Sequence, residues 1–144
     1  MIGWLLRLSD SARDRARRRV EAPGQAAGRR GEDLAHRYLE DRGMKIVARN
    51  WRPSTGSGEV DLIAWEQDTL VFVEVKSRAS DEYGAPARNV DEQKRQALVG
   101  AGRNYARRAG VEWERVRFDL VGIIFGEPPE ITHVKDAFKA ERVL

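Results

Sequence analysis

Residues 71–78, VFVEVKSR, begin as a buried strand and then place a carboxylate and an amine two residues apart. Successive side chains of a strand point to opposite faces of the sheet, so Glu74 and Lys76 share one face with Phe72. The other face carries only branched apolar side chains: Val71, Val73 and Val75. Because both faces are mostly apolar, the pattern predicts a strand covered on both sides, where an unpaired charge costs several kcal/mol. The two charges therefore need partners or a chemical role.

The residues before this strand predict its neighbour in the sheet. Residues 58–65, GEVDLIAW, have the pattern of a second strand, and the short EQDT segment between the two indicates an antiparallel hairpin. With the turn centred between Gln67 and Asp68, Asp61 stands directly opposite Glu74, where Cβ atoms are roughly 4.5 to 5.5 Å apart. The same register pairs only apolar residues on the other face: Ala64 with Val71, Leu62 with Val73, and Val60 with Val75. A shift of one residue would break both patterns.

Two carboxylates held this close predict a metal site. Like charges repel unless a proton or a cation lies between them, and we expect a divalent cation between Asp61 and Glu74. Carboxylate oxygens suit Mg²⁺ or Mn²⁺, which share their coordination with water and substrate oxygens. Such an ion stabilises charge on a phosphoryl oxygen and promotes ionisation of a bound water. Lys76 is expected to orient or deprotonate that water, or to hold the phosphate.

Length and charge set the limits of the chain's organisation. The 144 residues suit one domain with one ordinary core. The net charge is +3, but residues 1–30 hold eight arginines against three acids, a net of +5, so the remainder carries −2. We interpret residues 1–25 as a basic, flexible arm ending in a linker at Pro23 and Gly24, and residues 26–144 as a single folded domain. A solubilising tail and a nucleic-acid-binding arm both fit this composition.

The residue types that are missing exclude several kinds of site. The chain has no cysteine, which excludes disulfides and thiolate zinc sites and favours a reducing, cytoplasmic compartment. No apolar run is long enough to span a membrane, and the apolar start, MIGWLLRL, lacks a preceding basic segment. Neither a membrane anchor nor a signal peptide is therefore expected.

Two amphipathic stretches predict helices that bring further charges to the sheet. The first follows Gly31 and ends at Gly43. Its apolar stripe places Glu32 on the inward side, either as part of the site or as a first-turn acid favoured by the helix dipole. The second begins at the N-cap Asn89 and runs to about residue 108. It carries Lys94 on its inward side, where this lysine approaches the site or a phosphate, or packs as a structural residue.

The remaining segments predict further strands of a mixed sheet. Residues 44–51, 114–125 and 130–138 contain strand-like runs. A crossover through the second helix predicts that the 114–125 strand runs parallel to residues 69–76. Within it, Arg117 and Asp119 share a face, and we interpret Asp119 as structural.

The two histidines do not form a metal site with each other. His36 and His133 lack metal-ligand spacing, and we interpret both as surface or structural residues.

These segments together resemble a known protein family. GEVD followed by VFVEVK is similar to the Asp and Glu-x-Lys signature of the PD-(D/E)XK nuclease superfamily, with Asp61, Glu74 and Lys76 at the three motif positions. Residues 26–125, including GRRGEDLAHRYLEDRGMKIVARNWR and YGAPARNVDEQKRQALVGAGRNYA, resemble the YraN family, whose fold is similar to that of archaeal Holliday-junction resolvases. One residue departs from the superfamily pattern, because Val60 rather than proline precedes Asp61.

The resemblance implies a fold, a metal site and a nucleic-acid substrate. The implied fold is restriction-endonuclease-like: an α/β mixed sheet with a central antiparallel hairpin flanked by helices. The implied ligands of Mg²⁺ or Mn²⁺ are Asp61, Glu74, the carbonyl of Val75 and the helix-borne Glu32, with Glu59 assisting and Lys76 near the water. The residues expected to contact nucleic acid are Arg49, Arg52, Arg78 and Lys94.

Three hypotheses of function follow. The first is a metal-dependent endonuclease that acts on DNA, with branched or junction DNA as the substrate that the resemblance suggests and a symmetric homodimer favoured if both strands are cut. The second is a nucleic-acid-binding or partner-binding module that keeps this fold without turnover. The third makes Glu74 and Lys76 a structural ion pair, which leaves the position of Asp61 unexplained.

Overall fold

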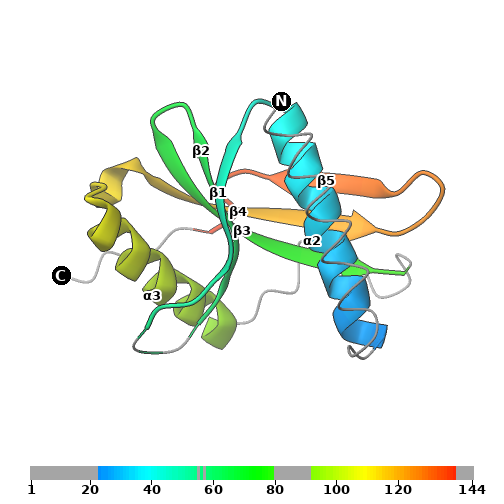
Figure 1. Cartoon of the computed structure of the whole chain (residues 1–144), viewed down its shortest axis with the longest axis horizontal. Coiled ribbons are helices and arrows are strands. Elements are labelled where there is room, and N and C mark those ends of the chain that lie inside the picture. Colours follow the sequence, from blue (N-terminus) through cyan, green and yellow to red (C-terminus); the bar gives the residue numbers. More distant parts are fainter. Residues whose placement is uncertain (1–22, 55, 57, 80–91, 139–144) are drawn as a thin grey trace.

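The computed structural model describes residues 23–54, 56, 58–79 and 92–138 of the chain. These residues form two α-helices, a short 3₁₀ helix and five strands (Figure 1). In chain order the elements are α2 (Pro23–Asp41), β1 (Lys45–Trp51), β2 (Val60–Glu66), β3 (Thr69–Arg78), α3 (Glu92–Ala109), η2 (Trp113–Arg115), β4 (Val116–Ile124) and β5 (Glu130–Val134).

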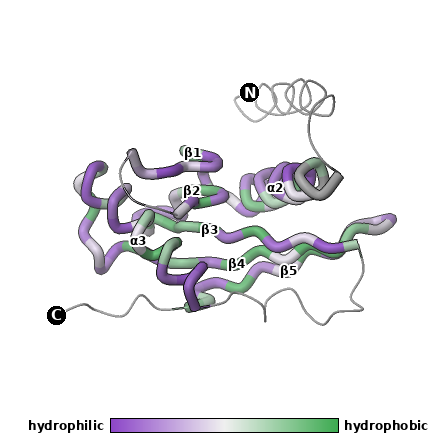
Figure 2. Tube along the Cα trace, turned by 90° about the horizontal axis from the view of Figure 1, so that it is seen from below, coloured by the Kyte–Doolittle hydropathy of each residue, from purple (hydrophilic) through white to green (hydrophobic). Residues whose placement is uncertain are grey.

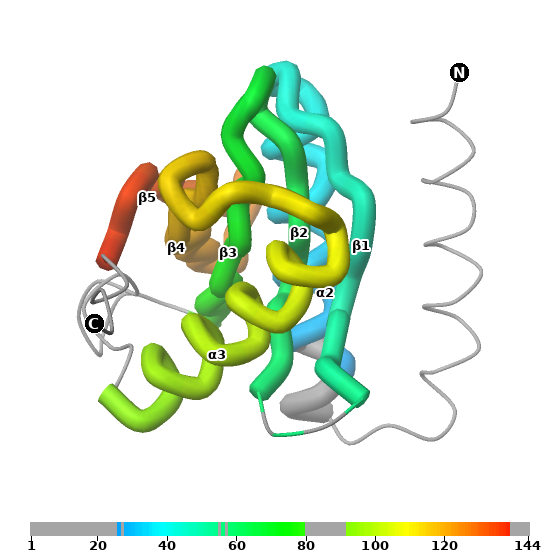
Figure 3. Tube along the Cα trace, turned by 90° about the vertical axis from the view of Figure 1, so that its left-hand side faces the viewer, coloured from blue at the N-terminus to red at the C-terminus, as the bar shows by residue number. Residues whose placement is uncertain are grey.

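The strands form one mixed sheet in the order β1, β2, β3, β4, β5. Neighbours are antiparallel except β3 and β4, which run parallel with α3 between them in the chain. Helix α3 lies across one face of the sheet and α2 across the other, so the central strands are covered on both sides (Figures 2 and 3). The predicted fold class and the predicted parallel crossover are confirmed, and the architecture agrees with a restriction-endonuclease-like fold.

Two apolar cores hold the layers together, one under each helix. The core on the α2 side contains Ala35, Leu39, Leu62, Ala64, Val71, Val73, Val121 and Ile123. The core on the α3 side contains Val60, Ile63, Leu70, Phe72, Leu98, Ala101 and Phe118. Burying one large apolar side chain contributes about 1.5 to 3 kcal/mol, so these two cores fix where the helices sit on the sheet.

Helix α2 begins at a proline and is followed by a glycine with a left-handed backbone. Gly43 ends it as predicted, with a φ of 92° and with its N–H donating to the Glu40 carbonyl at 3.0 Å, while the Met44 N–H donates to the Leu39 carbonyl at 3.0 Å. The prediction that Pro23 and Gly24 form a linker was wrong, because α2 starts at Pro23. Proline is tolerated in a first helical turn, where its missing N–H would have no partner.

The β2–β3 hairpin has the predicted register from its turn as far as Leu62 and Val73, and the paired residues do not extend to Asp61 and Glu74. Ile63 pairs with Phe72, and Leu62 pairs with Val73. Gln67, at the predicted centre of the turn, has a left-handed φ of 53°.

Val60 does not follow the predicted alternation of the faces. We expect it on the α2 side with Leu62, but it is buried in the core on the α3 side. Its partner in β1, Trp51, packs against the same core. Asn50 has a left-handed φ of 50°, and this irregularity of β1 accompanies the change of face. Asp61 therefore lies between two residues of β2 that are buried on opposite faces of the sheet, at the point where the regular alternation of the strand is interrupted.

A buried charge network fastens β5 to β4. Asp119 is fully buried and accepts hydrogen bonds from Arg117 at 2.7 and 2.8 Å, from the Asp136 N–H at 3.0 Å and from His133 Nε2 at 2.8 Å. Burial acts to raise the pKa of Asp119, but these contacts, Arg117 first, bring it below its usual value. Arg117 and Asp119 thus share a face of β4, as alternation predicts, and they pair there.

Two further expectations, the N-cap at Asn89 and the lack of a membrane-spanning helix, can be compared only with the residues that the structure describes. The N-cap Asn89 lies outside them, and α3 is described from Glu92 onward. Neither α2 nor α3 is long and apolar enough to cross a membrane, which is a statement about the described residues only.

Candidate active site

Asp61 and Glu74 lie side by side on β2 and β3. The two carboxyl groups are close enough to repel each other and to share a hydrogen bond. Burial raises the pKa of Asp61 well above its usual value of 3.8, and the charge of Glu74 raises it further. The Glu74 side chain is only 3% exposed. The predicted juxtaposition of two acids is therefore present, in surroundings that favour a proton or a cation between them.

Two lysines flank this acid pair. The Nζ atom of Lys94, on α3, lies 2.7 Å from Oε1 of Glu74. Lys76 is on the Glu74 face of β3, as alternation predicts, and interacts with Lys94, Glu74 and Asp61.

The surroundings shift the pKa values of the two lysines in opposite directions. Burial, and then the neighbouring Lys94, lower the pKa of Lys76, so this amine loses its proton more readily than an ordinary lysine. Burial also acts to lower the pKa of Lys94, but the hydrogen bond to Glu74, the charge of Glu74 and the smaller effects of Lys76 and Asp61 together outweigh burial and raise the pKa. Of the two amines, Lys94 thus holds its proton more firmly.

Glu32 reaches the acid pair from α2. The preceding residue, Gly31, lets the helix approach β3 closely, because a Cβ atom there would lie 2.8 Å from the side chain of Ser77. Burial raises the pKa of Glu32, against the lowering effect of a hydrogen bond with Asn50. The charge of Glu32 in turn raises the pKa of Asp61. The structure therefore brings together the predicted catalytic residues Glu32, Asp61, Glu74 and Lys76.

The protein ligands at this site fit a divalent cation whose remaining coordination positions are filled by water and by a substrate. Asp61 Oδ2 accepts the Val75 N–H at 2.8 Å and Glu74 Oε1 pairs with Lys94 Nζ, so each acid has one oxygen engaged within the protein. Among the described residues no three acidic or histidine side chains are grouped to hold a metal by themselves. Mg²⁺ commonly takes one or two carboxylates and fills its octahedron with water and phosphate oxygens. The Val75 carbonyl remains a predicted ligand.

The residues expected to contact nucleic acid differ in their surroundings. Arg49 is 14% exposed and donates to Asp33 at 2.6 Å, so it also ties β1 to α2. Arg52 is 74% exposed and donates to Glu59 Oε2 at 3.0 Å. Arg78 is half-buried at the end of β3. Lys94 is 48% exposed beside the acid pair. Contact of these residues with a phosphate backbone stays a prediction.

Sequence reasoning missed two residues that shape the site. Asn50 has a left-handed backbone within β1 and hydrogen-bonds with Glu32, and Asp33 accepts a hydrogen bond from Arg49. The sequence carries one usable signal, because asparagine is among the residues that best tolerate a left-handed backbone and its presence inside a strand-like run is unusual. Asp33 carries no such signal, since its partner is remote in the sequence.

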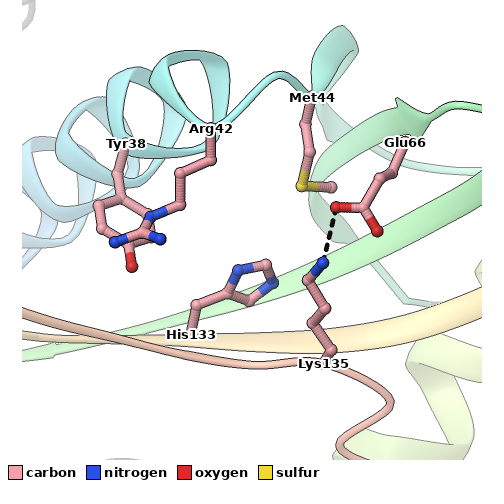
Figure 4. A pocket seen from close by; sticks show the side chains of 6 residues that line it. All are labelled: Tyr38, Arg42, Met44, Glu66, His133 and Lys135. Carbon is pink, nitrogen blue, oxygen red and sulfur yellow. Dashed lines mark hydrogen bonds and ion pairs between the residues drawn. The ribbon is translucent and has the colours of Figure 1, made fainter.

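A cavity of about 460 Å³ lies elsewhere in the fold, between α2, the end of β2 and β5 (Figure 4). It is lined by Tyr38, Arg42, Met44, Glu66, His133 and Lys135. The guanidinium of Arg42 lies 4.2 Å from the centre of the Tyr38 ring, and Lys135 pairs with Glu66 at 2.8 Å. None of the four clustered catalytic candidates lines this cavity, so it is separate from the acid pair.

Comparisons with known proteins agree with the sequence resemblance. A profile described as "Uncharacterised protein family UPF0102" matches residues 31–123. A UPF0102 protein of Solibacter usitatus is 49% identical to this chain over 138 residues, which are 96% of this chain and 100% of that protein. A UPF0102 protein of Rhodococcus jostii is 51% identical over 115 residues, 78% of this chain and 96% of that protein. One from Persephonella marina is 36% identical over 111 residues, 77% and 91% of the two chains.

Proposed function

The chain belongs to the uncharacterised protein family UPF0102, the YraN family, within the PD-(D/E)XK nuclease-like superfamily, and on this premise we propose that it is a metal-dependent DNA endonuclease. The observation that carries the proposal is the position of Asp61 beside the buried Glu74, where burial and then the charge of Glu74 raise the pKa of Asp61. A protein that only binds nucleic acid gains nothing from two carboxylates held against each other. A divalent cation between them resolves the repulsion and supplies hydrolytic chemistry.

The residues divide the work of phosphodiester hydrolysis. Asp61 and Glu74 hold the cation, and the Val75 N–H keeps the Asp61 carboxylate in place. The ion, when bound, stabilises charge on the phosphoryl oxygen and promotes ionisation of water. Lys76, whose pKa is lowered first by burial, orients the attacking water or accepts its proton. Glu32 adds a third acid at the edge of the cluster.

DNA is the proposed substrate, with branched or four-way-junction DNA as the preferred form. This choice rests on the resemblance of the chain to archaeal Holliday-junction resolvases. The exposed Arg52 directly follows β1, and the half-exposed Lys94 lies on α3 beside the cluster; there they would contact phosphates. Cutting both strands of a junction would use a symmetric pair of sites, so we expect a homodimer on the substrate.

The test is a cleavage panel with the full chain. Duplex, flap and four-way-junction DNA are incubated with protein and increasing Mg²⁺ or Mn²⁺, and nicks are read on denaturing gels. Glu74→Gln, Asp61→Asn and Lys76→Met are each expected to lower the rate by at least about 100-fold. Glu66→Gln is the matched control, because it changes a β2 carboxylate that is paired with Arg117 and Lys135 instead.

The same panel decides against the proposal if cleavage is absent or survives Glu74→Gln. Salt-sensitive DNA binding that is unaffected by chelation and by all three substitutions would instead identify a nucleic-acid-binding module.

A further inference from the structure

The contact between Lys94 and Glu74 joins a half-exposed amine to a buried acid. Their Nζ and Oε1 atoms are 2.7 Å apart, and the side chains are 48% and 3% exposed. Leu98 and Ala101 already pack α3 onto the sheet. Lys94 lies one helical turn before Leu98, and its long, flexible side chain extends to the acid pair.

This ammonium stands where a metal ion would act. The positive charge of Lys94 beside Glu74 offsets part of the repulsion between Glu74 and Asp61. A divalent cation would have the same effect. Lys76 supplies a second amine to the same cluster and interacts with Lys94. A cation bound by Asp61 and Glu74 would therefore lie close to both amines, and of the two lysines Lys94 has the more exposed side chain.

We propose that Lys94 is a built-in competitor for the cation: it occupies Glu74 when no metal is bound and must move aside for metal to bind. This inference rests on the proposed function, because it takes Asp61 and Glu74 to be the metal ligands. Its consequence is that Lys94 weakens metal affinity in the free protein. The acid pair is thereby kept neutralised until a cation arrives, and the displaced ammonium is then left at the surface beside the site.

The experiment measures binding of Mn²⁺ to the full chain without nucleic acid, by calorimetry at neutral pH. Lys94→Met is expected to tighten Mn²⁺ binding about five- to tenfold, because it removes an ion pair and a repelling charge. Lys94→Gln gives a second, polar variant, and circular dichroism shows that each variant is folded. Lys135→Met is the matched control: it removes another half-exposed lysine that pairs with a carboxylate at 2.8 Å, and it should leave Mn²⁺ affinity unchanged.

The outcomes separate this inference from the proposed function. Unchanged or weaker Mn²⁺ binding in both Lys94 variants, with binding abolished by Glu74→Gln, would overturn the competition and leave the metal site standing. Absence of Mn²⁺ binding in the wild-type protein and in both variants would overturn both. Binding that appears only after Lys94 is replaced would support the competition in its strongest form.

Discussion

The carboxylate of Asp61 accepts a hydrogen bond from the backbone N–H of Val75, with Oδ2 and N 2.8 Å apart. The regular pairing of β2 with β3 extends only as far as Leu62 and Val73, so beyond it a side chain joins the strands. This bond fixes Asp61 beside Glu74 although the two charges repel. The strain of that repulsion is the basis of the first two predictions.

Asp61→Asn should stabilise the metal-free protein while destroying the proposed site. Asparagine keeps an oxygen that can accept the Val75 N–H but removes the charge that repels Glu74. Opposed like charges in a sheet cost up to about 1 kcal/mol, so the free energy of unfolding in urea should rise by about that amount. Asp68→Asn, at an exposed turn position of the same hairpin, is the control and should have little effect. A less stable Asp61→Asn protein would contradict the repulsion.

The stability gained by Asp61→Asn should depend on pH. The pKa of Asp61 in the folded protein is raised above its usual value of 3.8, mainly by burial. The folded state therefore holds this proton more tightly than the unfolded chain does, and wild-type stability falls as the pH rises from the usual value through the raised one. Urea unfolding with a chelator present should show wild type and variant nearly equal at about pH 4 and diverging at higher pH. A constant difference across that range would exclude Asp61 as the titrating group.

Asp119 should behave in the opposite way. The hydrogen bonds to Asp119, that from Arg117 first, outweigh burial and lower the pKa of Asp119. The ionised carboxylate therefore stabilises the folded state at pH values above the usual pKa of an aspartate. That stability is lost as the pH falls through the lowered pKa. Removing one partner of a buried ion pair is costly, so Asp119→Asn should lose about 3 kcal/mol in urea unfolding at neutral pH. Glu66→Gln, which touches the more exposed end of the same network, should lose no more than about 1 kcal/mol. Equal losses would mean that burial of Asp119 is not what matters.

Gly58 should be hard to replace because of both its backbone and its neighbour. Its φ is 105°, and a Cβ atom there would lie 2.5 Å from the Ala97 carbonyl oxygen of α3. Gly58→Ala should therefore destabilise the protein by about 1 to 3 kcal/mol and move α3, which carries Lys94, away from β2. Gly100→Ala, inside α3 and with nothing near its Cβ position, should stabilise by about 0.5 to 1 kcal/mol. Thermal unfolding of the two variants tests the pair, and equal shifts would contradict this account.

The elements and register of the hairpin could be predicted because they depend on local pattern. Alternation along residues 69–76 and a short turn leave one register that buries the apolar residues, and the structure has it. The end of α2 at Gly43 is equally local, since a left-handed residue there lets the last carbonyls find donors. The errors at Pro23 and Val60 arose where a local signal has two structural meanings. A proline both opens helices and breaks them, and alternation fails at a backbone irregularity.

What the sequence by itself determined is the hairpin, the two helix-covered faces and the juxtaposition of Asp61 with Glu74, because spacing along a strand and across a short turn fixes these. Only the tertiary structure decided which remote groups reach the acids. Lys94 comes from α3 and Glu32 from α2, through close approaches at Gly58 and Gly31 that no periodicity records. Their contacts depend on how whole helices dock on the sheet, and docking is set by the summed packing of both cores rather than by any local pattern.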